Sequence, residues 1–192
     1  MHRDRRAGEA RGRVGKGVLD AAFGPRDGAL HCEEVSAERI AREVGTPTFV
    51  YSAKVIRERY RVLSAALAGV PHRLHFTLKA NSNRAVLTLL RGLGAGVDVV
   101  SGGELYRAQQ AGFAGGDTLF GGVGKSALEL REAVLAGVKL INVESLAELE
   151  LLSSIAQELG ATAAVGLRIN PEVLVETPHA YIATGAKGHK FG

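Results

Sequence analysis

The sequence has little cysteine and no long apolar run. Cys32 is the only cysteine among the 192 residues, so the chain can form neither an internal disulfide nor a metal site of several thiolates. No apolar run approaches the roughly 20 residues that a membrane span needs, and residues 1–17 contain no hydrophobic segment of the secretory kind. We therefore expect a cytoplasmic protein with no membrane partner.

Beyond residues 1–17, basic and acidic side chains are equal in number, so most of the chain has no excess of either charge. The formal net charge is +4, and the surplus of basic side chains lies within residues 1–17. We predict a disordered basic tail over residues 1–26 and no nucleic-acid partner for the folded part, whose charges balance. The six histidines show no metal-ligand spacing, so we predict no metal site.

What the sequence does contain is an alternation of apolar strands with amphipathic helices. A short helix over residues 36–45, a strand over residues 46–51 and a helix over residues 53–67 precede it. The predicted strands then cover Leu74–Leu78, Val97–Val100, Thr118–Phe120, Lys139–Val143 and Ala163–Ile169. The predicted helices between them cover Arg84–Arg91, Gly103–Ala111, Ala127–Leu135 and Leu146–Leu159. Nearly continuous apolar strands are typical of a parallel sheet covered by helices.

This alternation predicts an α/β fold that is part of a (β/α)8 TIM-type barrel, with an open doubly wound sheet as the alternative. A closed barrel takes about 250 residues, so we expect residues 53–192 to be only the first part, truncated before closure. Residues 27–52 are predicted to form a separate segment. Three helix starts carry the capping-box pattern S-x-x-E, namely Ser101 with Glu104, Ser126 with Glu129, and Ser145 with Glu148.

One nucleotide-binding motif is present only in part. The stretch GGVGKS, residues 121–126, lies between a predicted strand and a predicted helix. A phosphate-binding P-loop needs a glycine five positions before Gly124, where this chain has Leu119. We interpret Ser126 as a helix cap and Lys125 as an ordinary loop lysine.

Lys79 stands at the end of the apolar strand Leu74–Leu78. The functional loops of a parallel barrel follow the carboxyl ends of its strands. A lysine there, partly desolvated by Phe76, could form a Schiff base with a carbonyl compound. Its position alone favours a solvated lysine at a strand end.

Several sequence blocks in order support the first interpretation. They are LKANSN, LGAGVDVVSGGELYRAQQAGF, FGGVGKS, INVESLAELELL and LRINP. Together they resemble the barrel half of the fold-type III pyridoxal-phosphate decarboxylases, and KANSN with SGGEL is similar to the diaminopimelate branch. The resemblance covers residues 27–192 and implies that Lys79 carries the pyridoxal 5'-phosphate.

The resemblance also implies roles for three further residues near the cofactor. Asp98 would position it, with a strand-end aspartate as the alternative; Glu104 has a match near the family's site but is also explained as a cap. Arg168 would bind a phosphate or carboxylate, or else form a structural ion pair.

The activity implied is decarboxylation of meso-2,6-diaminopimelate to L-lysine and CO2 by a homodimer whose second domain would pack with residues 27–52. Much of the family's site lies beyond Gly192, so we expect these 192 residues to be inactive alone. The alternatives are a decarboxylase acting on a carboxylated polyamine precursor, ornithine or arginine, and a non-catalytic cofactor-binding module.

Overall fold

The computed structural model describes residues 22–170. The chain divides into two compact units, Met1–His72 and Arg73–Gly192. The helix that begins at Ala53 falls within the first of these units, and the predicted domain boundary at residue 53 stays a prediction. Residues 1–21 of the predicted tail and residues 171–192 of the predicted barrel lie outside the described residues.

The described part of the first unit contains an antiparallel sheet that the sequence analysis did not predict. Its strands are β1 (Phe23–Arg26), β2 (Ala29–Cys32) and β3 (Val35–Ser36), in the order β1-β2-β3. Asp27 and Gly28 connect β1 to β2 with φ angles of 51° and 81°, the left-handed geometry of the tight turn for which Asp-Gly is favoured. The predicted disordered tail is thus wrong for Phe23–Arg26.

Two helices follow in the same unit. Helix α2 (Ala37–Val44) ends at Gly45, and helix α3 (Ala53–Ala66) begins after the cap Ser52. Glu33 Oε1 accepts hydrogen bonds from Ser52 Oγ at 2.8 Å and from Lys54 N at 2.9 Å, which lower the pKa of this carboxyl. The predicted strand over residues 46–51 is wrong, because no strand of the described sheets pairs with it.

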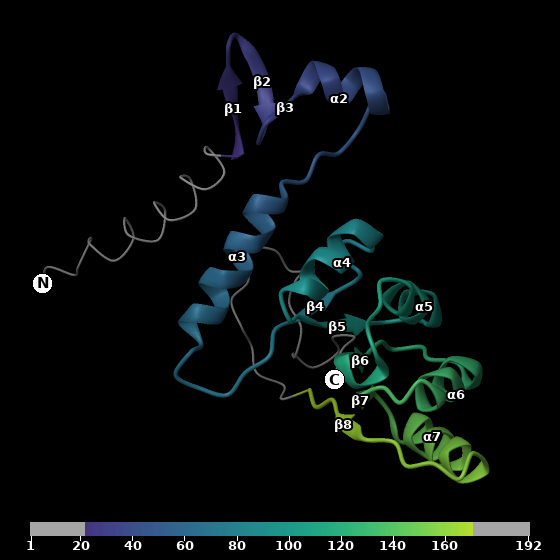
Figure 1. Ribbon diagram of the computed structural model, residues 1–192. Helices are drawn as coiled ribbons and strands as arrows, with labels where there is room; N and C mark the ends of the chain where they lie inside the picture. Colours follow the sequence, from purple (N-terminus) through teal and green to yellow (C-terminus); the bar gives the residue numbers. More distant parts are fainter. Residues whose placement is uncertain (1–21, 171–192) are drawn as a thin grey trace, which may run out of the picture. The chain divides into compact units, whose positions relative to one another are not determined.

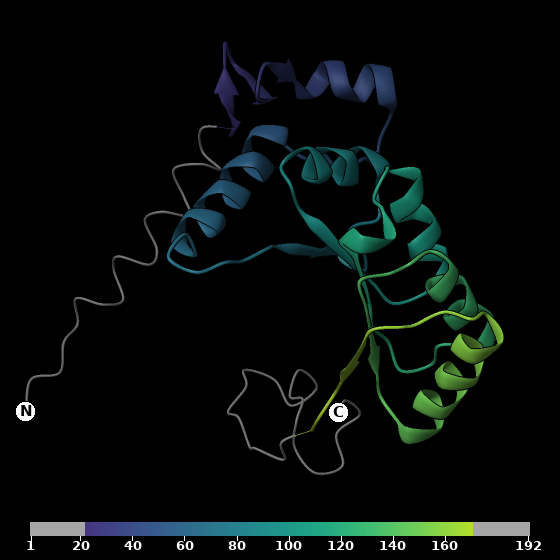
Figure 2. The same ribbon diagram turned by 60° about the horizontal axis from the view of Figure 1, so that its bottom comes forward.

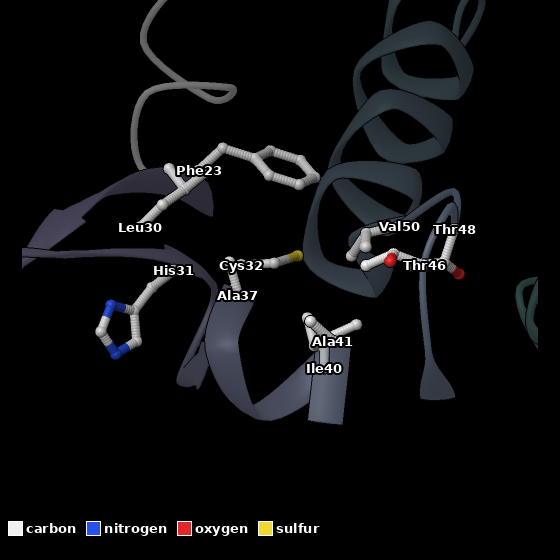
Figure 3. Close-up of a pocket in the computed structure, with 10 residues that line it drawn as sticks. All are labelled: Phe23, Leu30, His31, Cys32, Ala37, Ile40, Ala41, Thr46, Thr48 and Val50. Atoms are coloured by element: carbon white, nitrogen blue, oxygen red, sulfur yellow. The ribbon is translucent and has the colours of Figure 1, made fainter. Parts of the chain in front are cut away.

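Cys32 borders an apolar cavity within this unit. The cavity has a volume of about 330 Å³, and Figure 3 shows the thiol pointing between Phe23 and the side chains of α2. Burial, and secondarily the charge of Glu33, raise the pKa of the Cys32 thiol. The thiolate is therefore disfavoured, and nothing here marks Cys32 as a nucleophile.

The second unit is the predicted α/β alternation. Its strands are β4 (His75–Thr77), β5 (Gly96–Val99), β6 (Thr118–Phe120), β7 (Leu140–Val143) and β8 (Val165–Leu167). Its helices are α4 (Arg84–Gly92), α5 (Gly102–Gln110), η1 (Gly115–Asp117), α6 (Ala127–Leu135) and α7 (Leu146–Glu158). Every predicted strand and helix of this region is present, within three residues at each boundary.

Strand order decides between the two predicted architectures. The sheet runs β4-β5-β6-β7-β8 with all neighbours parallel, and α4–α7 lie on one side of it (Figures 1 and 2). A doubly wound sheet would reverse its strand order and carry helices on both faces. The described part is therefore an open segment of a barrel-type winding.

The two faces of this sheet differ in composition. Val97, Val99 and Phe120 face the helices and are 0% exposed, within a core that also includes Leu87, Leu130 and Ile141. Thr77, Asp98 and Leu119 alternate with them, share one row across β4–β6, and are half-buried. Side chains alternate along a strand, so the polar side chains of Thr77 and Asp98 lie on the face without helices, together with Leu119.

Only one of the three predicted capping boxes is complete. Ser126 and Glu129 bond each other's backbone amides. Glu104 and Glu148 instead accept from the amide before the serine, Val100 N at 2.8 Å and Glu144 N at 3.1 Å. The reason is backbone geometry: Ser101 and Ser145 have φ of −157° and −159°, whereas Ser126 has −74°, and φ sets how the preceding peptide lies against the helix.

Candidate active site

A pocket of about 500 Å³ lies in the second unit, at the carboxyl ends of the parallel strands. Every strand from β4 to β8 contributes to it, directly or through the loop that follows. Its lining comprises Lys79, Asp98, Val100, Gly121, Gly122, Asn142, Glu144, Leu167, Arg168 and Ile169. This is the edge at which parallel barrels place their functional residues, as the sequence predicted for Lys79.

Lys79 lies in the turn that directly follows β4. Leu78 anchors this turn, being 1% exposed, and its N–H donates to Asp98 O at 3.0 Å. The Lys79 side chain is exposed. Phe76 packs against the core on the helix-covered face, so the predicted desolvation of Lys79 by Phe76 is wrong, since residues 76 and 79 point to opposite faces.

The asparagines that follow Lys79 shape its loop. Asn81 Oδ1 accepts from Asn83 N at 2.9 Å, and Asn83 Oδ1 accepts from Ala85 N at 2.9 Å as the cap of α4. Such local side-chain bonds are the usual role of asparagine at turns and helix starts. They account for Asn81 and Asn83 structurally and leave Lys79 as the pocket residue of this loop.

Asp98 lines the same pocket from the middle of β5. Thr77 Oγ1 on the adjacent strand donates to Asp98 Oδ2 at 3.0 Å, and these two residues are register partners. The carboxylate is therefore held by one hydrogen bond and half-buried. The structure brings Asp98 together with Lys79, as predicted, while its contact with a cofactor stays a prediction.

Arg168 enters the pocket after β8 and forms an ion pair there. Its Nη1 lies 3.1 Å from Glu144 Oε1 and 3.3 Å from Oε2. The Glu144 side chain is 7% exposed and that of Arg168 is 38% exposed. The structure is therefore compatible with both predicted roles of Arg168, the structural ion pair and the binding of a phosphate or carboxylate. Arg168 pairs with an almost buried carboxylate and still borders the pocket.

Glu104 does not line the pocket. Its Oε2 accepts from Val100 N, and its own N–H donates to Ser101 Oγ at 3.2 Å. This is the structural role of a helix start. Val100 does line the pocket, so Glu104 can influence the site only through the backbone that it holds.

Comparison with known proteins adds a match over most of the chain. The family model described as "Pyridoxal-dependent decarboxylase, pyridoxal binding domain" matches residues 53–192. The chain belongs to this decarboxylase family. The predicted cofactor and the fold-type III class are confirmed at the level of the family.

Two groups of relatives differ in their similarity to the chain. Diaminopimelate decarboxylase of Pseudomonas aeruginosa is 50% identical over 170 residues, which are 88% of this chain and 41% of the relative. The Helicobacter pylori diaminopimelate decarboxylase structure complexed with L-lysine is 40% identical, with a TM-score of 0.76 over 81% of this chain and 39% of that one. The Vibrio vulnificus lysine/ornithine decarboxylase complexed with putrescine is 26% identical, with a TM-score of 0.61 over 71% and 38%. The chain thus spans about 41% of the length of the curated relative.

Some pocket residues of this decarboxylase domain escaped the sequence analysis. Asn142 and Glu144 follow the same pattern as Asp98 and Val100, because each pair precedes a capping serine by three and one positions. Comparing VDVVSGGEL with INVESLAEL could have found them. Gly122 has a φ of 106°, and a Cβ there would lie 2.9 Å from Val100 O, so the pocket wall requires glycine at this position.

Lys125 is not the ordinary loop lysine that we predicted. Its side chain is 0% exposed and its Nζ lies 2.6 Å from Glu148 Oε1. The ammonium also donates to Gly122 O at 2.6 Å and to Asn142 O at 2.8 Å. The prediction failed because two of its three partners, Asn142 and Glu148, come from β7 and α7, which no local motif identifies.

Neither a membrane-spanning helix nor a cluster of metal-binding side chains is found among the described residues. Within residues 22–170 no helix combines the length and apolar character needed to cross a membrane. In the same part of the chain, no group of three or more His, Cys, Asp or Glu side chains could hold a metal ion.

Proposed function

We propose that this chain is the cofactor-binding portion of an enzyme that decarboxylates meso-2,6-diaminopimelate to L-lysine and CO2, with Lys79 holding the pyridoxal phosphate. The observation that carries the proposal is the placement of Lys79 at a pocket formed by the ends of the parallel strands. The 50% identity to a diaminopimelate decarboxylase favours this substrate over ornithine or lysine.

The pocket residues fit pyridoxal phosphate. The exposed Lys79 amino group can attach covalently to an aldehyde. Gly121 and Gly122 present backbone without side chains to the pocket, which suits the close approach of a flat ring. When bound, the cofactor supplies an electron sink that stabilises the carbanion left by loss of CO2.

The chain's own residues would orient the reactants. Thr77 holds the Asp98 carboxylate in one position through its hydrogen bond, so Asp98 offers a fixed negative charge beside Lys79 in the pocket. Glu144 orients the Arg168 guanidinium, whose planar donors match a phosphate or a substrate carboxylate. We keep Glu104 as a residue that acts on the site through Val100.

The assembly and its location follow as parts of the same proposal. The full-length protein would be a cytoplasmic homodimer, and residues 27–52 would pack with a second domain. Sedimentation of the full-length gene product should give a dimer, and a monomer at micromolar concentration would contradict this part.

Covalent labelling tests the central assignment. The full-length gene product containing these residues, treated with pyridoxal phosphate and borohydride and then digested, should carry the pyridoxyl label on Lys79. Among the described residues that line the pocket, Lys79 is the only lysine. A label on any other lysine of the protein would refute the proposed role. Release of CO2 from diaminopimelate, measured against ornithine, arginine and lysine, identifies the substrate, and faster turnover of any of those three would refute our choice.

A further inference from the structure

Lys125 forms the buried underside of the pocket without lining it. Its ammonium donates hydrogen bonds to Gly122 O at 2.6 Å and to Asn142 O at 2.8 Å. It also forms an ion pair with Glu148 Oε1 at 2.6 Å, a buried oxygen that accepts no hydrogen bond from the described residues. A lysine is rarely buried unless its charge is paired and its donors are used. The Lys125 charge is paired with Glu148, and two of its donors bind backbone carbonyls, so the buried ammonium connects the loop after β6 with the end of β7.

The carbonyl of Asn142 shows why a donor is needed there. The last register pair between β6 and β7 is Phe120 with Ile141, so Asn142 extends beyond the end of the β6 ladder. Lys125 Nζ donates to the Asn142 carbonyl at this point. The lysine thus takes the place of a backbone donor where the shorter strand has ended.

The two residues whose carbonyls accept hydrogen bonds from Lys125 both belong to the pocket wall. Gly122 and Asn142 line it. An ideal Cβ on Gly166 of β8 would lie 2.5 Å from Asn142 Oδ1, and one on Gly121 would lie 4.0 Å from Asn142 Nδ2. The Asn142 amide therefore lies across the pocket between β6 and β8, and a shift of its backbone would displace that amide.

Glu148 extends the network to the ion pair of the site. Its Oε1 faces Lys125 Nζ, while its Oε2 accepts from Glu144 N at 3.1 Å. Glu144 in turn pairs with Arg168. A single chain of contacts thus runs from the buried ammonium to the cation in the pocket.

We propose that Lys125 is a positioning residue that sets the pocket wall of the decarboxylase site by fixing Gly122, Asn142 and, through Glu148, the Glu144–Arg168 pair. The inference rests on the proposed function, because it assumes that this pocket receives the cofactor. Lys125 itself touches neither cofactor nor substrate.

The test compares two lysines in the full-length gene product. Lys125→Met removes the donors at similar volume, and Lys139→Met makes the same change at an exposed lysine just before the other end of β7. We expect Lys125→Met to raise the dissociation constant for pyridoxal phosphate by about tenfold or more, as small displacements of a site do. Amide hydrogen exchange should become faster over residues 121–125 and 142–145, and Lys139→Met should change neither property.

Further variants separate positioning from stability. Lys125→Arg keeps a charged donor and should recover part of the cofactor affinity. Glu148→Gln keeps the volume but removes the charge, and should weaken affinity in the same direction by about threefold; it decides the question if Lys125→Met does not fold. A folded Lys125→Met protein with wild-type cofactor affinity and exchange, or an unaltered Glu148→Gln protein, would overturn the inference. Failure of the wild type to label at Lys79 would instead overturn the proposed function.

Discussion

The helix-covered face of the β4–β8 sheet carries buried apolar side chains, whereas its uncovered face carries polar side chains that belong to the pocket. The covered face carries Val97, Val99 and Phe120, all 0% exposed, packed against α4–α7. The other face carries Thr77 and Asp98, half-buried and joined by a hydrogen bond. The same strands thus supply apolar burial on one side and polar, orienting groups on the other, because successive side chains alternate in direction.

This difference separates stability from chemistry within one short sheet. Changes on the covered face should lower the free energy of unfolding, and changes at the pocket should alter cofactor binding with little effect on stability. Lys125 crosses this division, because it is buried like a core residue and yet holds the pocket wall. Variants on each face of the sheet test this division.

Lys79→Met should abolish the covalent pyridoxyl label after borohydride reduction, because the attaching amine is gone. Since the side chain is exposed, the free energy of unfolding should change by less than about 0.5 kcal/mol. Mass spectrometry of the digested protein and denaturant titration measure the two properties. The comparison of the faces fails if Lys79→Met loses as much stability as a core substitution.

Phe120→Ala should lower the free energy of unfolding by about 3–5 kcal/mol, because it removes a fully buried ring and leaves a cavity. Leu119→Ala is the matched control on the other face, where the side chain is half-buried, and its loss should be less than half as large. Urea denaturation of both variants measures the difference. Equal losses would show that the uncovered face is packed as well as the covered one.

Gly122→Ala should lower the free energy of unfolding by about 1–3 kcal/mol. The φ of 106° is strained for alanine, and the new Cβ would lie 2.9 Å from Val100 O. Gly121→Ala is the paired control, since its Cβ would meet only Asp98 Oδ1 at 3.8 Å and Asn142 Nδ2 at 4.0 Å. Thermal unfolding should distinguish the two variants. Equal losses of stability in the two variants would show that the pocket wall does not require glycine at position 122.

Glu129→Gln should make the free energy of unfolding less dependent on pH under acid conditions, because it removes a carboxylate whose protonation destabilises the fold. Hydrogen bonds from Gly102 N, then from Ser126 N and Oγ, lower the pKa of Glu129 below its ordinary 4.5. Its stabilising effect is therefore complete above pH 4.5 and is lost as the pH falls through the lowered folded-state pKa.

Unfolding free energies measured across that window should fall less steeply for Glu129→Gln than for the wild type. Glu150→Gln, at an exposed position of α7, should follow the wild-type curve. An identical slope for Glu129→Gln and the wild type would contradict the assignment of this carboxylate.

Local patterns were enough for most of the fold but not for the first unit. Apolar runs and helix periodicity located β4–β8 and α4–α7 because each pattern is complete within one element. Residues 46–51 look like a strand but have no partner in the described sheets. The turn at Asp27–Gly28 was a readable hairpin signal, and we overlooked it because the flanking strands are only four residues each.

The site was predictable in part for the same reason. Lys79 and Asp98 follow from strand ends and from the family resemblance, and the structure brings both to one pocket. Two of the three S-x-x-E motifs depart from the expected bonding because the serine φ differs. Lys125 was misread because its partners lie up to 23 positions away, at Glu148.

The sequence by itself determined the order of strands and helices in the second unit, the lysine at a strand end and the family. These depend on local periodicity and on residue identity. Only the tertiary structure decided that β4–β8 form a sequentially ordered sheet, that Asp98 and Arg168 share the pocket of Lys79, and that Lys125 is buried beneath it. The physical reason is that strand pairing and charge burial depend on contacts between segments far apart in the chain. The groups that stabilise the buried Lys125 ammonium come in part from such distant segments.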